Sequence, residues 1–261
     1  MSSPAVAITG LGLWMPGCPS IDEWVAGNRD GEAVKPAGLA LDRVNRRRAG
    51  RHGRAIADAV AAAGEQAGVD LATVPMVVGS SVGEASTMVN LLDQLWRKKE
   101  PMSPAAFTVS VHNAASGLLS ISNKNRGYTT SLAADEDTPA AALLEGIGLV
   151  VSGGCPVLVV CADEESPGPL AGSCPPWTQL AAAVVLAPEE AAENRLATVR
   201  VSFEGAASIA PSAAGDHMVH NPQIGMLDLI DAVLRRESGT LALDRGTGRG
   251  FMATLAPGGG A

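Results

Sequence analysis

The stretch that decides the fold lies between residues 137 and 161. It begins with Asp137-Thr-Pro-Ala-Ala-Ala-Leu-Leu-Glu-Gly-Ile-Gly-Leu-Val-Val151 and, after a turn, continues as Pro156-Val-Leu-Val-Val-Cys161. The first part predicts a long helix. The second predicts a strand buried on both faces, because its side chains are all apolar. Upstream, the uncharged run Met76-Val-Val-Gly-Ser80 predicts a strand that leads into a helix over residues 84–97. Strands that alternate with helices in this way indicate a layered α/β sheet.

Further elements are predicted on both sides of this stretch. They are strands over residues 5–10, 179–187, 196–204 and 250–255, and helices over residues 20–24, 54–67, 113–121 and 223–236. Ser20 is the candidate N-cap of the first of these helices, since its hydroxyl can accept a hydrogen bond from the first turn. Pro188-Glu-Glu190 separates the strands over 179–187 and 196–204, so we expect these two strands to form a hairpin.

The composition excludes several classes of protein. The chain has 261 residues, of which 46% are hydrophobic, so it can bury a core and is not a disordered tail. Its net charge of −8 argues against a nucleic-acid-binding protein, because such proteins neutralise phosphates with positive charge. The four cysteines show no metal-ligand spacing, and glycines and a proline interrupt the uncharged run over 146–162. We therefore expect a cytoplasmic protein with free thiols, no membrane span, no metal and no cofactor.

The motif Gly10-x-Gly12 follows the first predicted strand, as it would in a dinucleotide-binding turn. That fingerprint requires a third glycine at the position of Met15, where a helix should begin, but Pro16 follows. A tight turn after an edge strand is therefore the favoured interpretation.

The motif Gly79-Ser-Ser-Val-Gly83 matches the G-x-S-x-G elbow that presents the nucleophile of serine hydrolases. Ser81 would be that nucleophile, and a base would come from the downstream residues Asp216, His217 and His220. The hydrolase fold needs several strands before its elbow, whereas one is predicted here. A serine hydrolase is kept as an alternative function.

Six arginines lie close together in a short segment of the chain. They are Arg43, Arg46, Arg47, Arg48, Arg51 and Arg54. One interpretation is a solvated face that pairs with the chain's own acidic residues. The other is a local basic patch that receives an acidic partner, since the chain as a whole is acidic.

Several segments resemble, in their order and spacing, the N-terminal half of β-ketoacyl synthases, which have a thiolase-like fold. The segments are Ile8-Thr-Gly-Leu-Gly12, Val78-Gly-Ser-Ser-Val-Gly83, Pro104-x-x-Phe107, Val111-His-Asn-Ala-Ala-Ser-Gly117, Gly153-Gly154 and Ala162-Asp163-Glu164. The resemblance implies an α/β thiolase-like fold, a layered sheet with helices and a shortened C-terminal part. It implies a ketosynthase-like domain over residues 1–204 and a C-terminal segment over residues 205–261 that packs on the same domain.

The chain departs from this family at the catalytic positions. A condensing enzyme of the family carries its cysteine at the N-terminus of the long buried helix, where the helix dipole lowers the thiol pKa. The resemblance places Glu136 approximately at that position, and no cysteine occurs between Cys18 and Cys155. The two histidine motifs of the family's C-terminal half are also missing. We therefore expect no catalytic residue and no condensing activity in the isolated chain.

A ketosynthase-like chain without its nucleophile resembles the chain length factors of type II polyketide synthases, and among them the shortened members of highly reducing, polyene-type systems. The resemblance implies a non-catalytic subunit that pairs with a catalytic ketosynthase, as a heterodimer or a higher hetero-oligomer, and limits the length of the acyl chain. Acyl carrier protein would meet the chain through that complex. Two alternatives stay open: the serine hydrolase, and a ketosynthase remnant with a purely binding role.

The resemblance also implies which elements meet the partner subunit. They are the elements around residues 103–135. The residues expected at this interface are Val109, Val111, Asn113 and Thr130.

The segment from residue 102 to residue 112 is expected to limit the acyl chain, because a bulky side chain at the dimer seam would end the tunnel. Phe107 is the first candidate for this stop, with Met102 and His112 behind it. Met88 is a weaker candidate from the neighbouring helix. The methionines and Phe107 have a second interpretation as ordinary core residues, and His112 has one as a structural histidine.

Overall fold

A single large sheet runs through the molecule. The computed structural model describes residues 2–28, 35–165, 168, 177–205, 220–244 and 248–258, and within these ranges the sheet has eight strands. The strands are β1 (Val6–Trp14), β2 (Met76–Gly79), β3 (Thr129–Leu132), β4 (Val157–Asp163), β5 (Leu180–Ala187), β6 (Ala197–Phe203), β7 (Gly239–Ala242) and β8 (Phe251–Pro257). Their order across the sheet is β3-β2-β4-β5-β1-β6-β8-β7. Every residue of β4 and β5 is buried, as the apolar sequence of both strands predicts.

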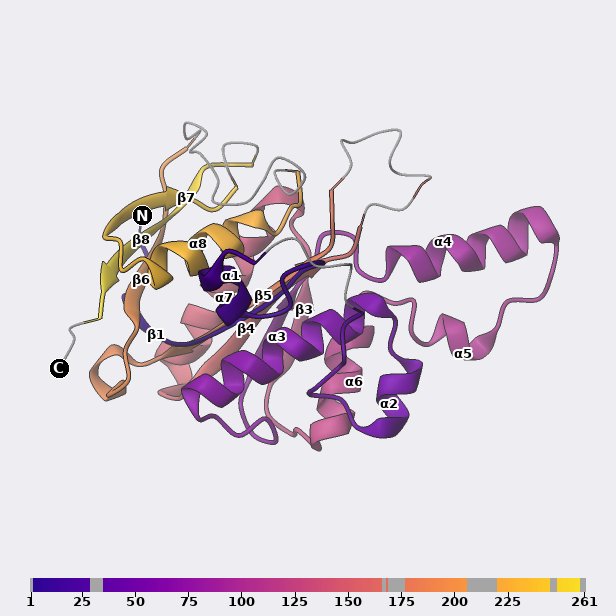
Figure 1. Ribbon diagram of the computed structural model, residues 1–261, viewed down its shortest axis with the longest axis horizontal. Helices are drawn as coiled ribbons and strands as arrows, with labels where there is room; N and C mark the ends of the chain where they lie inside the picture. The colour runs from indigo at the N-terminus through magenta and orange to yellow at the C-terminus, as the bar shows by residue number, and fades with distance from the viewer. Residues whose placement is uncertain are drawn as a thin grey trace.

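Helices cover both faces of the sheet (Figure 1). They are α1 (Ile21–Ala26), α2 (Arg43–Arg48), α3 (Arg51–Ala67), α4 (Ala85–Asp93), the π-helix η1 (Gln94–Lys98), α5 (Pro104–Phe107), α6 (Ala114–Asn123), the 3₁₀ turn η2 (Asp135–Asp137), α7 (Thr138–Gly153), the 3₁₀ turn η3 (Glu189–Ala191) and α8 (Ile224–Leu234). In the parts of the chain described, no helix is long and apolar enough to cross a membrane.

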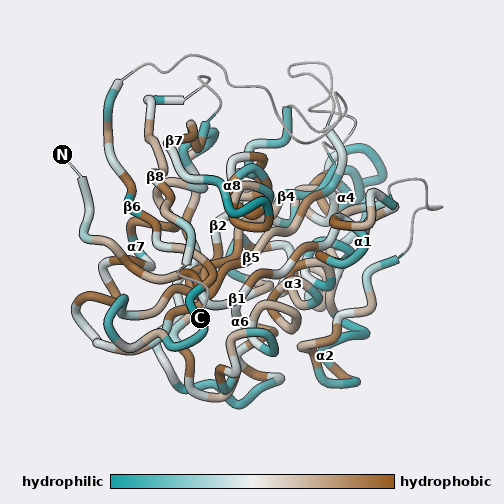
Figure 2. Tube along the Cα trace, turned by 60° about the vertical axis from the view of Figure 1, so that its left-hand side comes forward, coloured by the Kyte–Doolittle hydropathy of each residue, from teal (hydrophilic) through white to brown (hydrophobic). Residues whose placement is uncertain are grey.

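The core lies on the two faces of the sheet. On one face the buried side chains of α3 and α6, such as Ile56 and Leu119, pack on the strands. On the other face those of α7 and α8, such as Leu143 and Leu227, do the same. Figure 2 shows the hydrophobic strands enclosed between these helices. The helix–sheet–helix layers confirm the α/β fold that the sequence predicts.

The position of β1 overturns one expectation. β1 lies between β5 and β6 and pairs antiparallel with both, so the strands over 179–187 and 196–204 do not form a hairpin. The proline at residue 188 indicates that the chain turns there, but it does not indicate which strands pair. Which strand fills the space between two others depends on pairing between residues that are far apart in the chain.

The glycines of the Gly10-x-Gly12 motif have a packing role. Both lie inside β1, an internal strand, so the interpretation as a tight turn after an edge strand is wrong. A Cβ at residue 12 would lie 1.9 Å from the carbonyl oxygen of Ala59, and one at residue 10 would lie 2.3 Å from that of Ala63. The two glycines therefore let the backbone of α3 approach β1 closely.

The other predicted elements are present with shifted ends. Ser20 caps α1 as predicted, since its hydroxyl accepts a hydrogen bond from the N–H of Glu23 at 3.2 Å. The elements that the sequence did not reveal are short: α2, α5, β3 and β7. In the C-terminal segment, β7 and β8 extend the same sheet and α8 joins its core. The division of the chain at residue 204 stays a prediction.

The segment from α4 to α5 projects away from the sheet (Figure 1). We call residues 85–107 the arm. α4 leaves the body of the molecule directly after the turn that follows β2, and η1 continues it to Lys98. The chain then returns through α5 toward α6. The arm thus begins at the end of β2, the strand that pairs with β3 at the edge of the sheet.

Candidate functional site

A buried carboxylate lies where the parallel strands β2 and β4 end. Ser80 follows β2, Asp163 is the last residue of β4, and the two strands run parallel, so both residues reach the same edge. The Ser80 hydroxyl donates to Asp163 Oδ1 at 2.6 Å. The backbone N–H groups of Ser81 and Val82 donate to the same carboxylate at 3.1 and 3.0 Å. Asp163 therefore fixes the turn that leads from β2 into the arm.

Gln223 ties the C-terminal segment to this carboxylate. Its Nε2 donates to Asp163 Oδ2 at 2.7 Å and to the Ser81 hydroxyl oxygen at 3.0 Å. Burial raises the pKa of Asp163, and the hydrogen bonds from Ser80, Val82, Gln223 and Ser81 oppose that shift. The sequence analysis named Asp163 only as part of the motif Ala162-Asp163-Glu164 and did not identify Gln223. The available signal was an acidic residue directly after an apolar strand.

The turn before α7 meets the same cluster. The Ser81 hydroxyl donates to the carbonyl oxygen of Asp135 at 2.7 Å and lies 3.1 Å from the Thr138 hydroxyl. Thr138 also donates to that carbonyl and accepts from the N–H of Ala134, at 2.7 and 3.0 Å. Asp135 has a φ of 49°, in the left-handed region. These bonds hold the turn in a conformation that is costly for a non-glycine residue.

Glu136 lies in the middle of this acidic turn, half-buried, two residues before Thr138, the first residue of α7. Asp137 holds the C-terminal segment over the turn, because its carboxylate accepts from the N–H of Arg249 at 2.9 Å and lies 3.4 Å from Arg249 Nε. The equivalence of Glu136 to the family's cysteine stays a prediction. The turn itself contains carboxylates and no thiol.

The described cysteines lie elsewhere in the fold. Cys18 and Cys161 have buried side chains, and Cys155 is half-buried. Burial and the neighbouring Asp163 raise the pKa of Cys161, which disfavours its thiolate. Neither buried thiol has the exposed, electropositive setting of a reactive cysteine.

The geometry around Ser81 does not build a hydrolase site within the described residues. The Ser81 hydroxyl forms hydrogen bonds with Asp135, Thr138 and Gln223. The backbone φ of Ser81 is not positive, whereas that of a strained nucleophile elbow is. His112 is close by, but its Nε2 lies 2.6 Å from the carbonyl oxygen of Ser80. His220 is exposed, and Asp216 and His217 lie outside the described residues.

The predicted tunnel residues divide into two groups. Met88, Met102 and Phe107 lie on the arm with exposed side chains, and Phe107 is 53% exposed. Phe107 therefore does not pack in this chain's own core. His112 is half-buried and belongs to the polar cluster, because its Nε2 contacts the carbonyl oxygen of Ser80. This contact is typical of a structural histidine.

The arm carries further exposed apolar residues that the sequence analysis did not identify. Leu92, Leu95 and Trp96 are exposed, and the Trp96 side chain is the most open of them at 75%. With Met88 they follow the spacing i, i+4, i+7, i+8, which puts them on one face of the helix formed by α4 and η1. That spacing is visible in the sequence. What the sequence does not show is that these side chains are exposed in the fold.

The predicted interface residues occupy three different settings. Val111 and Asn113 are exposed just before α6, and Thr130 lies on β3 at the edge of the sheet. Val109 is partly buried against the core of the α3 face, so much of its surface is used inside the chain.

The arginine cluster contains internal and exposed side chains. Arg46 Nε donates to the carbonyl oxygen of Gly38 at 3.0 Å, and Arg54 Nε donates to that of Ala49 at 3.2 Å. The exposed members are Arg43, Arg47, Arg48 and Arg51. None of these four forms an ion pair with a residue of the described ranges. Both interpretations of this cluster stay predictions.

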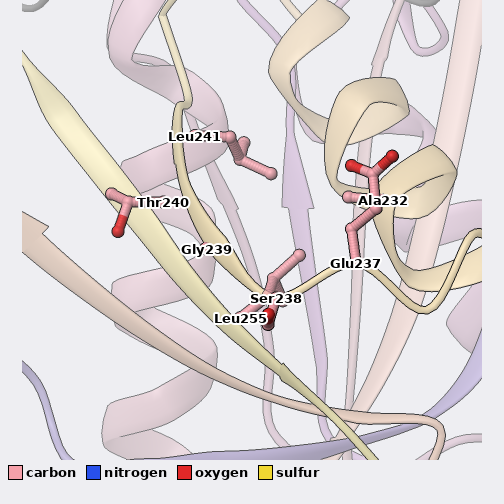
Figure 3. Close-up of a pocket in the computed structure, with 7 residues that line it drawn as sticks. All are labelled: Ala232, Glu237, Ser238, Gly239, Thr240, Leu241 and Leu255. Atoms are coloured by element: carbon pink, nitrogen blue, oxygen red, sulfur yellow. The ribbon is translucent and has the colours of Figure 1, made fainter.

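A small pocket lies far from the polar cluster, at the edge of the sheet opposite β3. It has a volume of about 100 Å³ and lies between α8 and the strands β7 and β8. Figure 3 shows Glu237, Thr240 and Leu241 among its lining residues. Within the described ranges, no three His, Cys, Asp or Glu side chains are grouped so that they could hold a metal ion.

Comparisons with known proteins agree on the family. Residues 22–246 match the model of the β-ketoacyl synthase, N-terminal domain. A comparison with curated proteins found no match. Among solved structures, the chain is similar to a ketosynthase (ApeO) in complex with its chain length factor (ApeC) from Xenorhabdus doucetiae, with a TM-score of 0.72 and 22% identity. That match covers 97% of this chain and 99% of the other.

Two further structures have the same fold. The ishigamide ketosynthase/chain length factor aligns with a TM-score of 0.72 and 18% identity over 98% of this chain and 100% of the other. A type II polyketide synthase acyl-carrier protein in complex with its ketosynthase (AntDE:AntF) contains a chain that aligns with a TM-score of 0.63 and 11% identity over 97% and 98%. These similarities show a thiolase-like ketosynthase fold. With its residues 22–246 matched, the chain belongs to the β-ketoacyl synthase N-terminal domain family.

Proposed function

We propose that this chain is a chain length factor, a non-catalytic subunit that pairs with a catalytic ketosynthase and limits the length of the polyketide or polyene acyl chain. The observation that carries the proposal is the acidic turn Asp135–Asp137 at the start of α7. A condensing enzyme needs a thiolate at this helix N-terminus to accept the acyl group. A carboxylate there is stabilised by the helix dipole but does not take an acyl group from a thioester.

The fold supports a ketosynthase as the partner. Two of the similar structures are described as a ketosynthase with its chain length factor, and almost the whole length of this chain aligns with a chain of each. A third is described as an acyl-carrier protein in complex with its ketosynthase. We propose that carrier protein reaches this chain through the complex. The exposed arginines of the 43–54 segment would suit an acidic surface on such a partner.

Two surfaces support the partner interface. β3 is the last strand on one side of the sheet, so its outer backbone groups are open to pair with another chain. The neighbouring arm exposes large apolar side chains that a soluble monomer usually covers. They are Met88, Leu92, Leu95, Trp96, Met102 and Phe107, and Val111 is exposed just after the arm. We propose that the ketosynthase covers both surfaces.

We expect Val111→Glu to weaken the complex at least about tenfold, because a partner that covers this side chain would bury an unpaired charge. Coexpression with a co-encoded ketosynthase, followed by size exclusion and a dissociation constant for the purified complex, measures the effect. Val25→Glu is the matched control, since Val25 is an exposed valine on α1, outside the arm. Equal affinity for wild type and Val111→Glu would remove residue 111 from the interface. Failure of wild type to bind any such ketosynthase would remove the proposed function.

We expect the isolated chain to gain no mass on incubation with an acyl-carrier thioester, because its α7 turn offers carboxylates where the family uses a thiol. Intact-mass spectrometry measures this, with the catalytic ketosynthase in the same incubation as the positive control. An acyl adduct on this chain would contradict the proposal. A fluorophosphonate adduct on Ser81 would support the serine hydrolase instead.

A further inference from the structure

Two helices meet at the base of the arm, and neither is capped by its own N-cap side chain. The N-cap of α3 is Gly50, and the N-cap of α4 is Glu84, for which no side-chain cap bond is present. Without such a cap, the first N–H groups of both helices require acceptors from elsewhere. Both acceptors are carboxylates.

The Glu84 carboxylate lies at the first turn of α3, and the Glu164 carboxylate lies at the first turn of α4. The Glu84 carboxylate reaches from the base of the arm to the first turn of α3, where a Cβ at residue 53 would lie 3.3 Å from its Oε1. Glu164, directly after β4, accepts from the N–H of Ser86 in the first turn of α4 at 2.6 Å. The fit under α3 is tight, because a Cβ at residue 50 would lie 2.7 Å from Glu84 Oε2. Both glutamates are buried, at 4% and 8% exposure.

The two buried carboxyl groups oppose each other's ionisation. Burial and the negative charge of Glu164 raise the pKa of Glu84 to about 8, and burial also raises the pKa of Glu164. At neutral pH Glu84 therefore holds its proton. A protonated carboxyl can still accept at α3 while the Glu164 carboxyl accepts at α4.

The other titratable groups around this pair do not supply a close positive charge. His52, on α3, is held neutral because burial, with a contribution from His112, lowers its pKa to about 4. His112 itself contacts the carbonyl oxygen of Ser80 through Nε2. Asp163 adds negative charge beside Glu164. Arg51, at the same end of α3, extends over the ring of Trp14 at 5.8 Å.

We propose that Glu84 and Glu164 form a buried carboxyl pair that anchors the arm to the body of the molecule, and that this pair links binding of the ketosynthase to the uptake of a proton. The proposal rests on the proposed function for the identity of the partner. Loss of the proton places two adjacent buried charges between α3 and α4. The first turn of α4 then separates from Glu164 or α3 separates from Glu84, and the apolar face of the arm loses its orientation.

The sign of the pH dependence follows from the raised pKa of Glu84. The anchor is complete while the group is protonated, and it weakens as the pH rises through about 8. If the arm binds its partner only in the protonated form, affinity falls up to about tenfold between pH 7 and pH 9, as expected for one proton.

The test measures the dissociation constant of the ketosynthase complex at several pH values from 6.5 to 9 for wild type and for Glu84→Gln. An amide cannot ionise in this range, yet it accepts from Gly53 and can donate to Glu164. We expect wild-type affinity to fall with pH and the variant to depart from it increasingly above pH 8. Since His112 is present in both proteins, the difference between them belongs to the carboxyl pair. Parallel curves for the two proteins would overturn the proposal.

Hydrogen exchange on the full-length chain without partner gives a second, independent measurement. We expect protection factors of residues 85–98 to fall between pH 7 and pH 9 in wild type, while those of α7 stay constant. The fall should be absent in Glu84→Gln, or in Glu164→Gln if the first variant does not fold. Constant protection of the arm in wild type would overturn the proposal. Loss of arm protection in a chain that binds no ketosynthase at any pH would support the anchor and contradict the proposed function.

Discussion

Asp163→Ala is expected to lower the free energy of unfolding by about 3–5 kcal/mol, because it removes a buried carboxylate that accepts four hydrogen bonds. The donors are the Ser80 hydroxyl, the backbone N–H groups of Ser81 and Val82, and the Gln223 amide. Without the carboxylate these groups stay buried and unpaired. For a chain of this size the loss corresponds to a melting temperature lower by roughly 6–20 °C, measured by calorimetry.

Glu100→Ala is the matched control for removing a carboxylate, since Glu100 lies exposed at the end of the arm. It should change the free energy of unfolding by no more than about 0.5 kcal/mol. Asp163→Asn should lie between the two, because its Oδ1 still accepts while its NH₂ faces other donors. A change of less than about 1 kcal/mol for Asp163→Ala would show that the turn after β2 does not depend on this carboxylate.

Phe107→Ala is expected to lengthen the product of the reconstituted ketosynthase complex by one or more two-carbon units. If Phe107 ends the acyl tunnel, one further extension must overpack its space, which costs about 1–3 kcal/mol. This is roughly one to two decades in the relative rate of that extension. Mass spectrometry of the products measures the chain-length distribution. Size exclusion of the same preparation checks that the complex is intact.

Phe203→Ala is the matched control, because Phe203 is 52% exposed but lies on β6, far along the sheet from β3. It should leave the product length unchanged. An intact Phe107→Ala complex that makes products of wild-type length would contradict a tunnel stop at this residue. That result would favour the alternative of a ketosynthase remnant with a purely binding role.

The sequence analysis located most of the elements because their signals are local. The apolar runs of β4 and β5 and the cap at Ser20 depend on neighbouring residues, and all three are present in the structure. The short elements β3 and α5 carried too few residues for a period to appear. The polar cluster was missed for another reason: Asp163 and Gln223 are 60 residues apart, and their hydrogen bond exists only in the fold.

The sequence by itself determined that this chain has no cysteine between Cys18 and Cys155, and that it repeats the order of motifs of a ketosynthase. These are properties of residue identity and spacing, so no tertiary structure can alter them. They lead to the family and to the expectation of an inactive condensing site.

The tertiary structure alone decided where β1 pairs, whether Phe107 is covered, and how Glu84 ionises. Strand order depends on hydrogen bonds between distant segments, and here it placed β1 between β5 and β6. From the sequence, Phe107 is compatible with a core position and with a surface position, and in the structure it is exposed on the arm. The pKa of Glu84 depends on burial and on Glu164, a residue that lies close only in the folded chain. For β1 and for Glu84, the deciding interaction joins residues that lie far apart in the linear sequence.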